Sequence, residues 1–290
     1  EIALLFAEES IDFIGNQSGV MMVNGVEVAT FRKATSEVVG KPTVNLQASF
    51  QEDVLRRDFT INAMGKKLSG SIIDYVGGQE DIKKKQIKAV GEPLERFLED
   101  PSRIVRGVYL ASALGFSIEE NTKRVMTENG FLLKQVPVEL IGKIVKKVID
   151  RNCLSSFTQS MKDLNLLSYV FPYLIHTVDL PQNPKYHDSC VFDHIIRVIK
   201  SAESRFPRNK VMLLTALFHD VAKGMPGVRG VNKVGQINDL NHEEMGVPIT
   251  KEALQQLQFG KDVVEPVLFL TEWHGIRLPE KPNRRTVTRT

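Results

Sequence analysis

Two arginines, an acid and an amide lie within nine residues, and together they are suited to hold a sugar-phosphate. The segment is Arg56-Arg57-Asp58-Phe59-Thr60-Ile61-Asn62-Ala63-Met64. Guanidinium groups pair with phosphate oxygens through two parallel hydrogen bonds, while carboxylate and amide groups bond to ribose hydroxyls. If the segment is helical, Asp58 and Asn62 share one face because they are four residues apart. The same spacing fits a capped, salt-bridged surface helix, so the residue types alone leave both interpretations open.

A second acid and a second guanidinium occur together in Glu99-Asp100-Pro101-Ser102-Arg103. An Asp can accept a hydrogen bond from an exocyclic amine, and an Arg can donate to a ring nitrogen or carbonyl. The two can therefore imitate the pairing edge of a nucleobase. Asp before Pro is also an ordinary helix start, with Asp100 as the N-cap. A capping role does not exclude base recognition.

A third group is rich in histidine: His194, the adjacent His219-Asp220, His242 and His274. Imidazole nitrogens with a carboxylate suit Mg²⁺, Mn²⁺, Ni²⁺ or Fe²⁺, and such a metal can lower the pKa of a bound water for attack on a phosphoester. Each histidine alone is more often structural. The adjacent doublet, with further histidines about one helix away on either side, favours a metal site formed by His194, His219, Asp220 and His242. Asp262 is a further candidate ligand.

The composition is that of an ordinary folded protein. The 290 residues are 42% hydrophobic and 25% charged, with 38 Lys+Arg against 35 Asp+Glu and a net charge of +3. This excludes overall disorder and leaves room for two or three compact units. Cys153 and Cys190 are far apart, which supports neither a disulfide framework nor a zinc-thiolate site. The longest apolar run, 211–218, is too short to span a membrane. We therefore expect a cytoplasmic protein without a membrane partner.

The elements that must position these groups change type near residue 92. Strands over 20–23 and 26–31, joined by Asn24-Gly25, predict a hairpin with a type I′ turn. A helix is expected over 56–64 and a strand over 71–74, whereas 33–52, with Gly40-Lys41-Pro42, is typical of a loop. The predicted fold class is α+β, mostly α. Helices are expected over 101–114, 119–129, 138–150, 154–170, 190–204, 211–222, 243–258 and 262–273.

Four segments together resemble the class II tRNA nucleotidyltransferase and bacterial poly(A) polymerase family. They are 26–32 (the strand before a flexible loop), 56–64 (the family signature), 74–82 (the motif between head and neck) and 99–103 (the nucleotide-selecting E-D-x-x-R motif). They occur in family order over about the first 130 residues. The resemblance implies nucleotide contacts in two groups. Arg56, Arg57, Asp58 and Asn62 would contact ribose and phosphates, while Asp100 and Arg103, with Arg106 continuing the motif, would select the base of CTP or ATP.

The histidine group resembles the HD metal-dependent phosphohydrolase superfamily. The doublet lies in 219–224, and 186–188, 192–194 and 241–246 resemble the flanking segments of the HD domain fused to tRNA nucleotidyltransferases. The combined resemblance implies four parts. These are the C-terminal part of a nucleotidyltransferase head over 1–90, a helical neck over 91–150, body helices over 151–180 and an HD domain over 181–290.

The family's catalytic metal ligands do not occur in the sequence. The family transfers nucleotides with two Mg²⁺ ions held by an Asp-x-Asp pair after a Gly-Gly-x-x-x-Arg-Asp turn, and residues 1–290 contain neither. We expect an N-terminally truncated chain, because the nucleotide-binding motifs look intact; a degenerate relative without polymerase activity is the alternative. Glu27 lies where related polymerases place a further acidic group, which makes it the candidate catalytic residue.

The resemblance implies a tRNA nucleotidyltransferase that adds C and A to tRNA 3′ ends from CTP and ATP with Mg²⁺. The alternatives are a poly(A) polymerase of the same family, an HD-type phosphohydrolase that removes a 2′,3′-cyclic phosphate or a phosphate with Mg²⁺, Mn²⁺ or Ni²⁺, and an RNA-binding scaffold. The loop over 33–46 lacks the Tyr/Asp/Arg-Pro pattern that the family associates with switching from C to A addition. Nucleotide addition is therefore the broader expectation and full CCA synthesis the narrower one.

Overall fold

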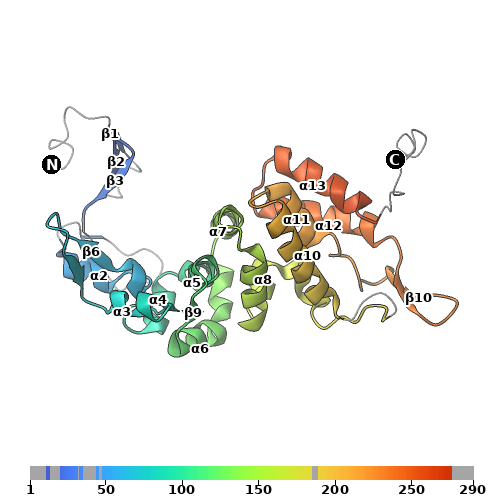
Figure 1. Cartoon of the computed structure of the whole chain (residues 1–290), viewed down its shortest axis with the longest axis horizontal. Coiled ribbons are helices and arrows are strands. Elements are labelled where there is room, and N and C mark those ends of the chain that lie inside the picture. Colours follow the sequence, from blue (N-terminus) through green and yellow to red (C-terminus); the bar gives the residue numbers. More distant parts are fainter. Residues whose placement is uncertain are drawn as a thin grey trace. The chain divides into compact units, whose positions relative to one another are not determined.

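The chain folds into two compact units with a mostly helical, α+β architecture (Figure 1). The computed structural model describes residues 11–13, 20–31, 33–34, 44–45, 48–184 and 189–275. The first unit comprises Glu1–Arg103 and Phe116–Met126, and the second comprises Ile104–Gly115 and Thr127–Thr290. The predicted fold class is confirmed. The finer division into head, neck, body and HD parts stays a prediction.

The first unit contains the predicted hairpin. Strands β1 (Ile11–Phe13), β2 (Val20–Val23) and β3 (Val26–Ala29) form an antiparallel sheet in that order. Asn24 and Gly25 have φ angles of 50° and 79°. Both are positive, as a type I′ turn requires, so the turn chemistry sets the register of β2 and β3.

Three further strand pairs are short. Strands β4 (Lys33–Ala34) and β5 (Val44–Asn45) are antiparallel, as are β6 (Met64–Lys66) and β7 (Ile72–Asp74), while β8 (Gln86–Ile87) and β9 (Ser117–Ile118) are parallel. The strand predicted over 71–74 is confirmed by β7. Strands β4 and β5 lie inside the segment that was expected to be a loop, and its Gly40-Lys41-Pro42 lies outside the described residues.

The helix expected over 56–64 is wrong. Helix α2 (Phe50–Leu55) starts at a capping box formed by Ser49 and Glu52 and ends before the first arginine. Phe59 is extended, with φ −130° and ψ 146°, is fully buried, and forms an isolated β-bridge with Ala89. Burial of this ring interrupts the helix, and a single 3₁₀ turn, η1 (Thr60–Asn62), follows.

Short helices complete the first unit: α3 (Gly78–Lys83), α4 (Pro93–Glu99) and most of α6 (Glu120–Glu128). The small apolar core that supports the arginine segment contains Val54, Ala63 and Val90, with Phe50 and Val76 packed against it. Ala63 of the signature segment is part of this core, so packing of the core fixes the backbone that carries the polar side chains of the segment.

The second unit is built almost wholly from helices. The helix predicted over 154–170 is split, because Asn165 takes a φ of 57°, and the helix predicted over 211–222 ends at Phe218. The other predicted helices are confirmed with shifts of a residue or two at their ends. The elements are α5 (Ser102–Leu114, its first two residues in the first unit), η2 (Gly130–Gln135), α7 (Val138–Asp150), α8 (Leu154–Asp163), α9 (Leu167–Val170), η3 (Pro172–Thr177), α10 (Val191–Arg205), α11 (Lys210–Phe218), α12 (His242–Gln256) and α13 (Lys261–Trp273), with the hairpin β10 (Arg229–Val231) and β11 (Ile237–Asp239).

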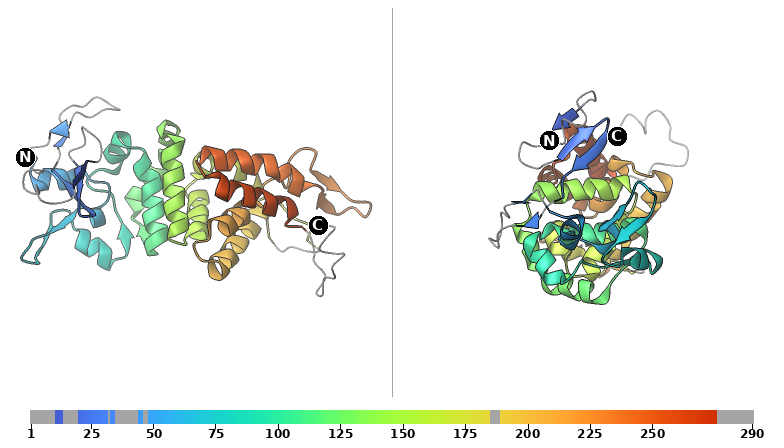
Figure 2. Two further views of the ribbon diagram at one scale, coloured as in Figure 1. Left: turned by 90° about the horizontal axis from the view of Figure 1, so that it is seen from above. Right: turned by 90° about the vertical axis from the view of Figure 1, so that its left-hand side faces the viewer.

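Helix α11 packs against two of the other last four helices, α10 and α13. It is capped by Asn209, whose Oδ1 accepts from the Met212 amide at 3.0 Å, and most of its residues are buried. Helix α10 packs on α11, α11 packs on α13, and α12 packs on α13, as the orange and red helices of Figure 2 show for the last pair. A helix that is apolar all round belongs inside a bundle. None of the described helices has the length and hydropathy of a membrane span.

Candidate nucleotide site and histidine centre

One buried carboxylate anchors both arginines of the signature segment. Asp53, 4% exposed, lies on the last turn of α2. Its Oδ1 accepts from the Arg56 Nε and Nη2 at 3.3 Å, and its Oδ2 accepts from the Arg57 Nε at 2.9 Å. The arginine side chains remain 33% and 42% exposed. Asp53 therefore holds two cationic groups side by side while leaving part of each accessible to an anion.

The acid and the amide of the segment are brought together by a turn. Asp58 is buried, and its Oδ1 accepts from the Phe59 amide at 2.8 Å and from the Asn62 Nδ2 at 3.4 Å. The Arg57 Nη1 donates to the Asn62 carbonyl at 3.0 Å. Asn62 itself is exposed. The proximity of Asp58 and Asn62 that the spacing suggested is therefore present, although a turn and a 3₁₀ helix produce it.

Arg103 is held against the arginine segment. Its Nη2 donates to the backbone carbonyl of Arg56 at 2.9 Å, and its Nη1 donates to the carbonyl of Arg96 at 3.0 Å and to the Glu99 Oε2 at 2.9 Å. Arg96 makes a parallel bond from its Nη1 to the carbonyl of Leu55 at 2.9 Å, and its Nη2 lies 2.8 Å from the Glu99 Oε1. Two guanidinium groups linked by one carboxylate thus satisfy the last carbonyls of α2.

Asp100 caps the helix that follows it. Its Oδ1 accepts from the Ser102 amide at 3.0 Å and from the Ser102 hydroxyl at 2.6 Å, so the capping interpretation is confirmed. Its side chain is 40% exposed, and its Oδ2 lies 4.0 Å from the Arg103 Nε. The acid and the guanidinium that the sequence assigns to base selection therefore stand next to each other in one unit.

The segment that follows β7 packs directly on the signature segment. The Asp74 carboxylate accepts four backbone N–H bonds, from Val76, Gly77 and Gly78 on Oδ1 and from Gln79 on Oδ2, at 2.8–3.1 Å. Burial by itself would raise the pKa of Asp74, but these four bonds lower it below its ordinary value. Asp74 therefore closes the turn before α3 as an anion.

Gly78 and Asp81 join this turn to Thr60. A Cβ on Gly78 would collide with the carbonyl oxygen of Thr60, so the backbones approach too closely for any side chain there. The Thr60 hydroxyl donates to the buried Asp81 Oδ2 at 2.6 Å. The two segments that the sequence resemblance links are therefore physically one assembly.

Two other predicted residues do not join this assembly. Glu27 lies on β3 opposite Met22 and is exposed, and within the described residues it belongs to no group that could hold a metal ion. Arg106 lies on the part of α5 that belongs to the second unit. Both stay predictions.

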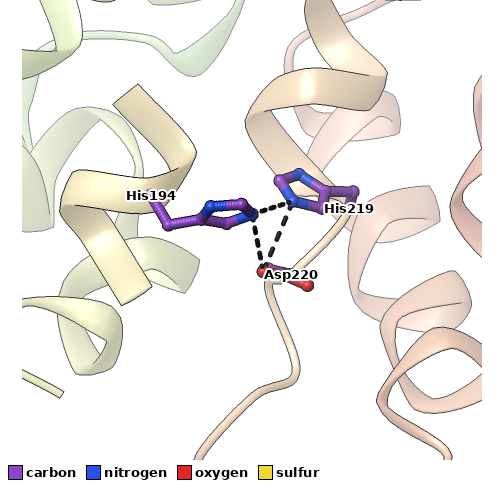
Figure 3. Close-up of side chains that lie close together, drawn as sticks. All are labelled: His194, His219 and Asp220. Carbon is purple, nitrogen blue, oxygen red and sulfur yellow. Dashed lines mark hydrogen bonds and ion pairs between the residues drawn. The ribbon is translucent and has the colours of Figure 1, made fainter. Parts of the chain in front are cut away.

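The histidine centre is built from the ends of four helices around one carboxylate. His194 is on α10, His219-Asp220 follows α11, His242 begins α12 and His274 follows α13. The Asp220 side chain is 1% exposed. Figure 3 shows the rings of His194 and His219 directed toward it. The Asp220 Oδ2 lies 3.5 Å from the His194 Nε2 and 3.3 Å from the His219 Nε2. The Asp220 Oδ1 lies 3.2 Å from the His242 Nε2 and 3.5 Å from the His274 Nε2.

Three of these rings use their other nitrogen to bond the backbone. The Nδ1 atoms of His219, His242 and His274 lie 3.0, 2.8 and 2.7 Å from the carbonyls of Ala216, Asp239 and Thr271. A carbonyl only accepts, so each Nδ1 carries hydrogen, and each neutral ring then presents a bare Nε2 lone pair to the centre. Histidines that bind metals are oriented in the same way.

The contacts within the histidine centre are unfavourable unless a cation lies between them. The Nε2 atoms of His194 and His219 are 3.2 Å apart, and those of His242 and His274 are 3.3 Å apart. Two lone pairs cannot bond each other, and the buried Asp220 Oδ1 accepts no hydrogen bond of good geometry. Opposed lone pairs beside an orphaned carboxylate oxygen require protons or metal ions between them, so these residues suit a divalent metal.

The local charges are consistent with an ionised carboxylate. Burial would raise the pKa of Asp220, but the charge of His219 and the close contacts with His219, His242 and His274 hold it well below its ordinary value. Burial would lower the pKa of His242, whereas its contact with Asp220 raises it above its ordinary value. In the absence of metal, protons would therefore occupy part of the centre.

The cluster in the structure contains one histidine more than the candidate metal-ligand set predicted from the sequence. His194, His219, Asp220 and His242 do come together, but His274 joins them, whereas Asp262 belongs to neither of the metal-type groups found among the described residues. The signal for His274 was its place one helix after His242. Residues 186–188, which resemble the first-histidine segment, lie outside the described residues. Two positioning residues, Asp53 and Arg96, were not predicted because their partners are recognised only in the fold.

Comparison with known proteins agrees with this architecture. Residues 6–88 match the family described as the Poly A polymerase head domain. The CC-adding tRNA nucleotidyltransferase of Thermus thermophilus is 32% identical over 253 residues, which cover 84% of this chain and 57% of that protein. The CCA-adding enzyme of Bacillus cytotoxicus is 36% identical over 167 residues, covering 56% of this chain and 42% of that protein. The chain thus spans about half the length of these curated relatives.

Solved structures show the same fold. A tRNA nucleotidyltransferase complexed with a primer tRNA and an incoming ATP analog matches with a TM-score of 0.62 and 24% identity, over 94% of this chain and 71% of that one. A tRNA-processing enzyme with CTP matches with a TM-score of 0.62 and 20% identity, over 94% and 66%. The fold and the matched segments define a nucleotidyltransferase head followed by helical parts. Residues 6–88 thus belong to the Poly A polymerase head-domain family, and over 84% of its length the chain is similar to a tRNA nucleotidyltransferase.

Proposed function

We propose that this chain is the nucleotide-selecting and helical portion of a tRNA nucleotidyltransferase that adds C and A to tRNA 3′ ends from CTP and ATP. The observation that carries the proposal is the bond from the Arg103 Nη2 to the Arg56 carbonyl at 2.9 Å. This bond joins the proposed base-selecting motif to the proposed phosphate-binding arginines. The relatives named as CC-adding and CCA-adding enzymes support the same reaction class.

The proposed residue roles follow from the chemistry of the side chains. Arg56 and Arg57, anchored by Asp53, would contact the triphosphate. Asp58 and Asn62 would contact the ribose. Asp100 and Arg103 would pair with the edge of cytosine or adenine, because both bases offer an exocyclic amine to a carboxylate and a ring nitrogen acceptor to a guanidinium.

Divalent metal, generally Mg²⁺, is the ion used by nucleotidyltransferases of this family, and it would activate the attacking 3′-hydroxyl and stabilise the leaving pyrophosphate. Residues 1–290 contain no Asp-x-Asp pair to hold it. Glu27 is the proposed acidic contribution of this chain. The assay of the reaction therefore uses the product of the whole gene.

The deciding experiment supplies that product with tRNA that ends before the final C, or before the final A, and with labelled CTP or ATP. Addition of C and A by one protein supports the proposal as stated. Addition of C alone would restrict it to a CC-adding enzyme, like the Thermus relative. Long adenosine tracts on any RNA would favour a poly(A) polymerase, and no addition at all would overturn the proposal.

A second candidate activity is metal-dependent phosphoester hydrolysis at the histidine centre. A cavity of about 270 Å³ lies beside His242. Most of its lining side chains are polar and are suited to hydrogen-bond the sugar or base that a phosphoester carries. Lys223, whose Nζ lies 2.7 Å from the Asp220 Oδ2, also lines it and would attract a phosphate. Mg²⁺, Mn²⁺ or Ni²⁺ are the proposed ions. The cavity is lined by Gln182, Asn183, Lys223, Asn232, Gln236, Ile237, Asn238, Asp239 and His242.

The two activities are separable by one substitution. His219→Ala is expected to abolish hydrolysis of a 2′,3′-cyclic nucleotide or a phosphomonoester while leaving nucleotide addition unchanged. Wild-type protein that hydrolyses neither substrate with any of the three ions would remove the second candidate. Equal loss of both activities in the variant would show that the histidine centre also supports nucleotide addition.

A further inference from the structure

Basic side chains gather where the end of α7 meets the turn between α10 and α11. Lys147 lies on the last turn of α7, and Arg151 directly follows that helix. Arg205 is the last residue of α10, Lys210 is the first residue of α11, and Arg208 lies in the turn between them. All five side chains are exposed. We call these five residues the basic surface.

Hydrogen bonds from Asn152 hold the two segments of the basic surface together. The Asn152 Nδ2 donates to the Glu203 carbonyl at 3.2 Å, and its Oδ1 accepts from the Arg208 amide at 2.9 Å. The Lys210 Nζ also lies 3.8 Å from the Asp150 Oδ1. These contacts place the turn between α10 and α11 beside the C-terminal end of α7, although more than fifty positions of sequence separate them.

Nearby acids leave most of this positive charge unbalanced. Asp150 pairs with Lys210. Both carboxylate oxygens of Glu203 are used by Ser155, whose amide and hydroxyl donate to them at 2.9 and 2.6 Å. Among the residues that the structure describes, the other four cations of the basic surface form no ion pair. The basic surface therefore offers exposed cations to an anionic partner.

The backbone conformation of Arg208 does not favour an arginine. Its φ is 63°, in the left-handed region that Gly, Asn and Asp adopt more readily than a long side chain does. The bond from its amide to the Asn152 Oδ1 holds this conformation. Because the side chain is exposed, packing does not require an arginine either. An unfavourable backbone conformation that carries an exposed guanidinium points to binding by that group.

An exposed aromatic ring lies within the basic surface. Phe206 directly follows α10 and is 44% exposed. Its amide donates to the Ala202 carbonyl at 2.8 Å, and its carbonyl accepts from the Asn209 amide at 3.1 Å, so the backbone that carries the ring is fixed. Surfaces that bind nucleic acids combine cations, which contact phosphates, with aromatic rings on which bases stack. An acidic protein surface would pair with the cations but would give the ring no partner.

We propose that the basic surface binds RNA, with its cations on phosphates and Phe206 stacked on one unpaired base. The identification of the polyanion as RNA rests on the proposed function, in which the substrate is tRNA. The basic surface belongs to the second unit, whereas the arginine segment and the Asp100–Arg103 turn belong to the first. The basic surface therefore contributes to RNA affinity and has no part in the selection of the nucleotide.

The test is equilibrium binding of a tRNA transcript to the whole 290-residue chain, measured by fluorescence anisotropy between about 50 and 200 mM KCl. Lys147→Gln and Arg208→Gln are each expected to weaken binding and to reduce the slope of log affinity against log salt by about one, because each removes one phosphate contact. Lys233→Gln is the matched control, an exposed lysine in the turn of the β10–β11 hairpin. Figures 1 and 2 show that hairpin at the opposite end of the second unit from α7, so its affinity and slope should equal those of the wild type.

Stacking is tested separately from charge. Phe206→Leu keeps an apolar side chain but removes the ring, and it is expected to weaken tRNA binding by about five- to 150-fold without changing the salt slope. Phe206→Tyr keeps the ring and should retain the wild-type affinity. Circular dichroism and thermal unfolding of both variants show that they are folded.

Two results would overturn the proposal. One is an equal effect of Lys233→Gln and Arg208→Gln, which would mean that only the total charge matters. The other is equal binding of tRNA and polyglutamate with no effect of Phe206→Leu, which would assign the basic surface to acidic proteins. The proposed function is tested by a different readout, nucleotide addition by the product of the whole gene. RNA binding at the basic surface without any nucleotide addition would remove the proposed function alone, whereas addition with unchanged RNA affinity in all the variants would remove this proposal alone.

Discussion

Arg103 donates from its Nη2 to the backbone carbonyl of Arg56 at 2.9 Å, across 47 positions of sequence. This bond, together with its Nη1 bonds to the Arg96 carbonyl and Glu99, uses three of the five N–H donors of the guanidinium. Its side chain is 12% exposed. In the proposed site, Arg103 therefore connects the two nucleotide-binding segments as well as facing the base, and its substitution should affect both roles.

Arg103→Ala is expected to reduce discrimination of CTP and ATP against GTP and UTP by about tenfold, because one good side-chain to base contact contributes about 1–3 kcal/mol of discrimination. Loss of affinity for CTP itself should be smaller than the loss of discrimination. The measurement is the dissociation constant of each triphosphate by calorimetry.

Arg96→Ala is the matched control for that variant. It removes an equivalent bond, from the Arg96 Nη1 to the Leu55 carbonyl at 2.9 Å, but no proposed base contact. Its discrimination should equal that of the wild type. If both variants lose discrimination equally, Arg103 acts only by supporting α2 and has no part in base selection.

Asp53→Asn is expected to raise the dissociation constants of all triphosphates by a similar factor, because it releases both anchored arginines without touching the base-selecting pair. The free energy of unfolding should fall by about 1 kcal/mol, a modest amount since both arginines are partly exposed.

Urea denaturation of the variant and of Glu80→Gln provides the comparison. Glu80 pairs with Lys84 at 3.6 Å in an exposed ion pair, so its loss should change stability by less than about 0.5 kcal/mol. Unaltered triphosphate affinity in Asp53→Asn would show that the buried carboxylate does not position the arginines for binding.

The stability that Asp74 supplies should depend on pH. Its pKa is lower in the folded chain than the ordinary value of about 3.8, so its contribution is fully present above that value and is lost as pH falls through the lower, folded value. Asp74→Asn is expected to be less stable than the wild type by about 1 kcal/mol at pH 7, since a capping carboxylate contributes about this much.

The difference should shrink as the pH falls below about 4 and should vanish only below the lower, folded pKa, because the wild-type carboxylate is protonated in the folded chain only there. Denaturation curves at pH 7, 5 and 3 measure this difference. A difference that stays constant across these values would mean that the charge of Asp74 contributes nothing to the turn.

Gly78→Ala is expected to destabilise the first unit by about 1–3 kcal/mol, because the new methyl group would collide with the Thr60 carbonyl. Gly70→Ala is a useful contrast, since its cost arises from a φ of 89° and no atom lies near the added Cβ. Thermal unfolding of both variants, with and without CTP, would reveal the coupling. If Gly78→Ala leaves CTP affinity unchanged, the turn does not position the arginine segment.

Local chemistry predicted the elements whose conformation is set by near neighbours. Asn24-Gly25 specified the hairpin turn, and Gly115, with a φ of 65°, ended α5 as expected. The helix over 56–64 failed because the ring of Phe59 is buried and pairs with Ala89, a contact that helical spacing cannot reveal.

In the candidate site, too, some features could be predicted from the sequence and others are seen only in the fold. Motif order predicted which side chains belong to it, but only the fold shows that Arg103 bonds to the Arg56 carbonyl and that one carboxylate, Asp53, serves both arginines. His274 illustrates a third case, since its ring reaches Asp220 only because α13 packs against α11 and α12. Such contacts depend on packing between elements that are distant in sequence, so the spacing of residues along the chain does not predict them.

The central claim, that the arginine segment and the Asp100–Arg103 turn form one nucleotide site, is tested most directly by equilibrium binding of CTP, ATP, GTP and UTP to the 290-residue chain with Mg²⁺ present. The account predicts one saturable site that binds CTP and ATP, discriminates against GTP and UTP, and is lost when Arg56 and Arg57 are both replaced by Ala. Equal binding of all four triphosphates, or binding of CTP and ATP that survives the double substitution, would contradict it.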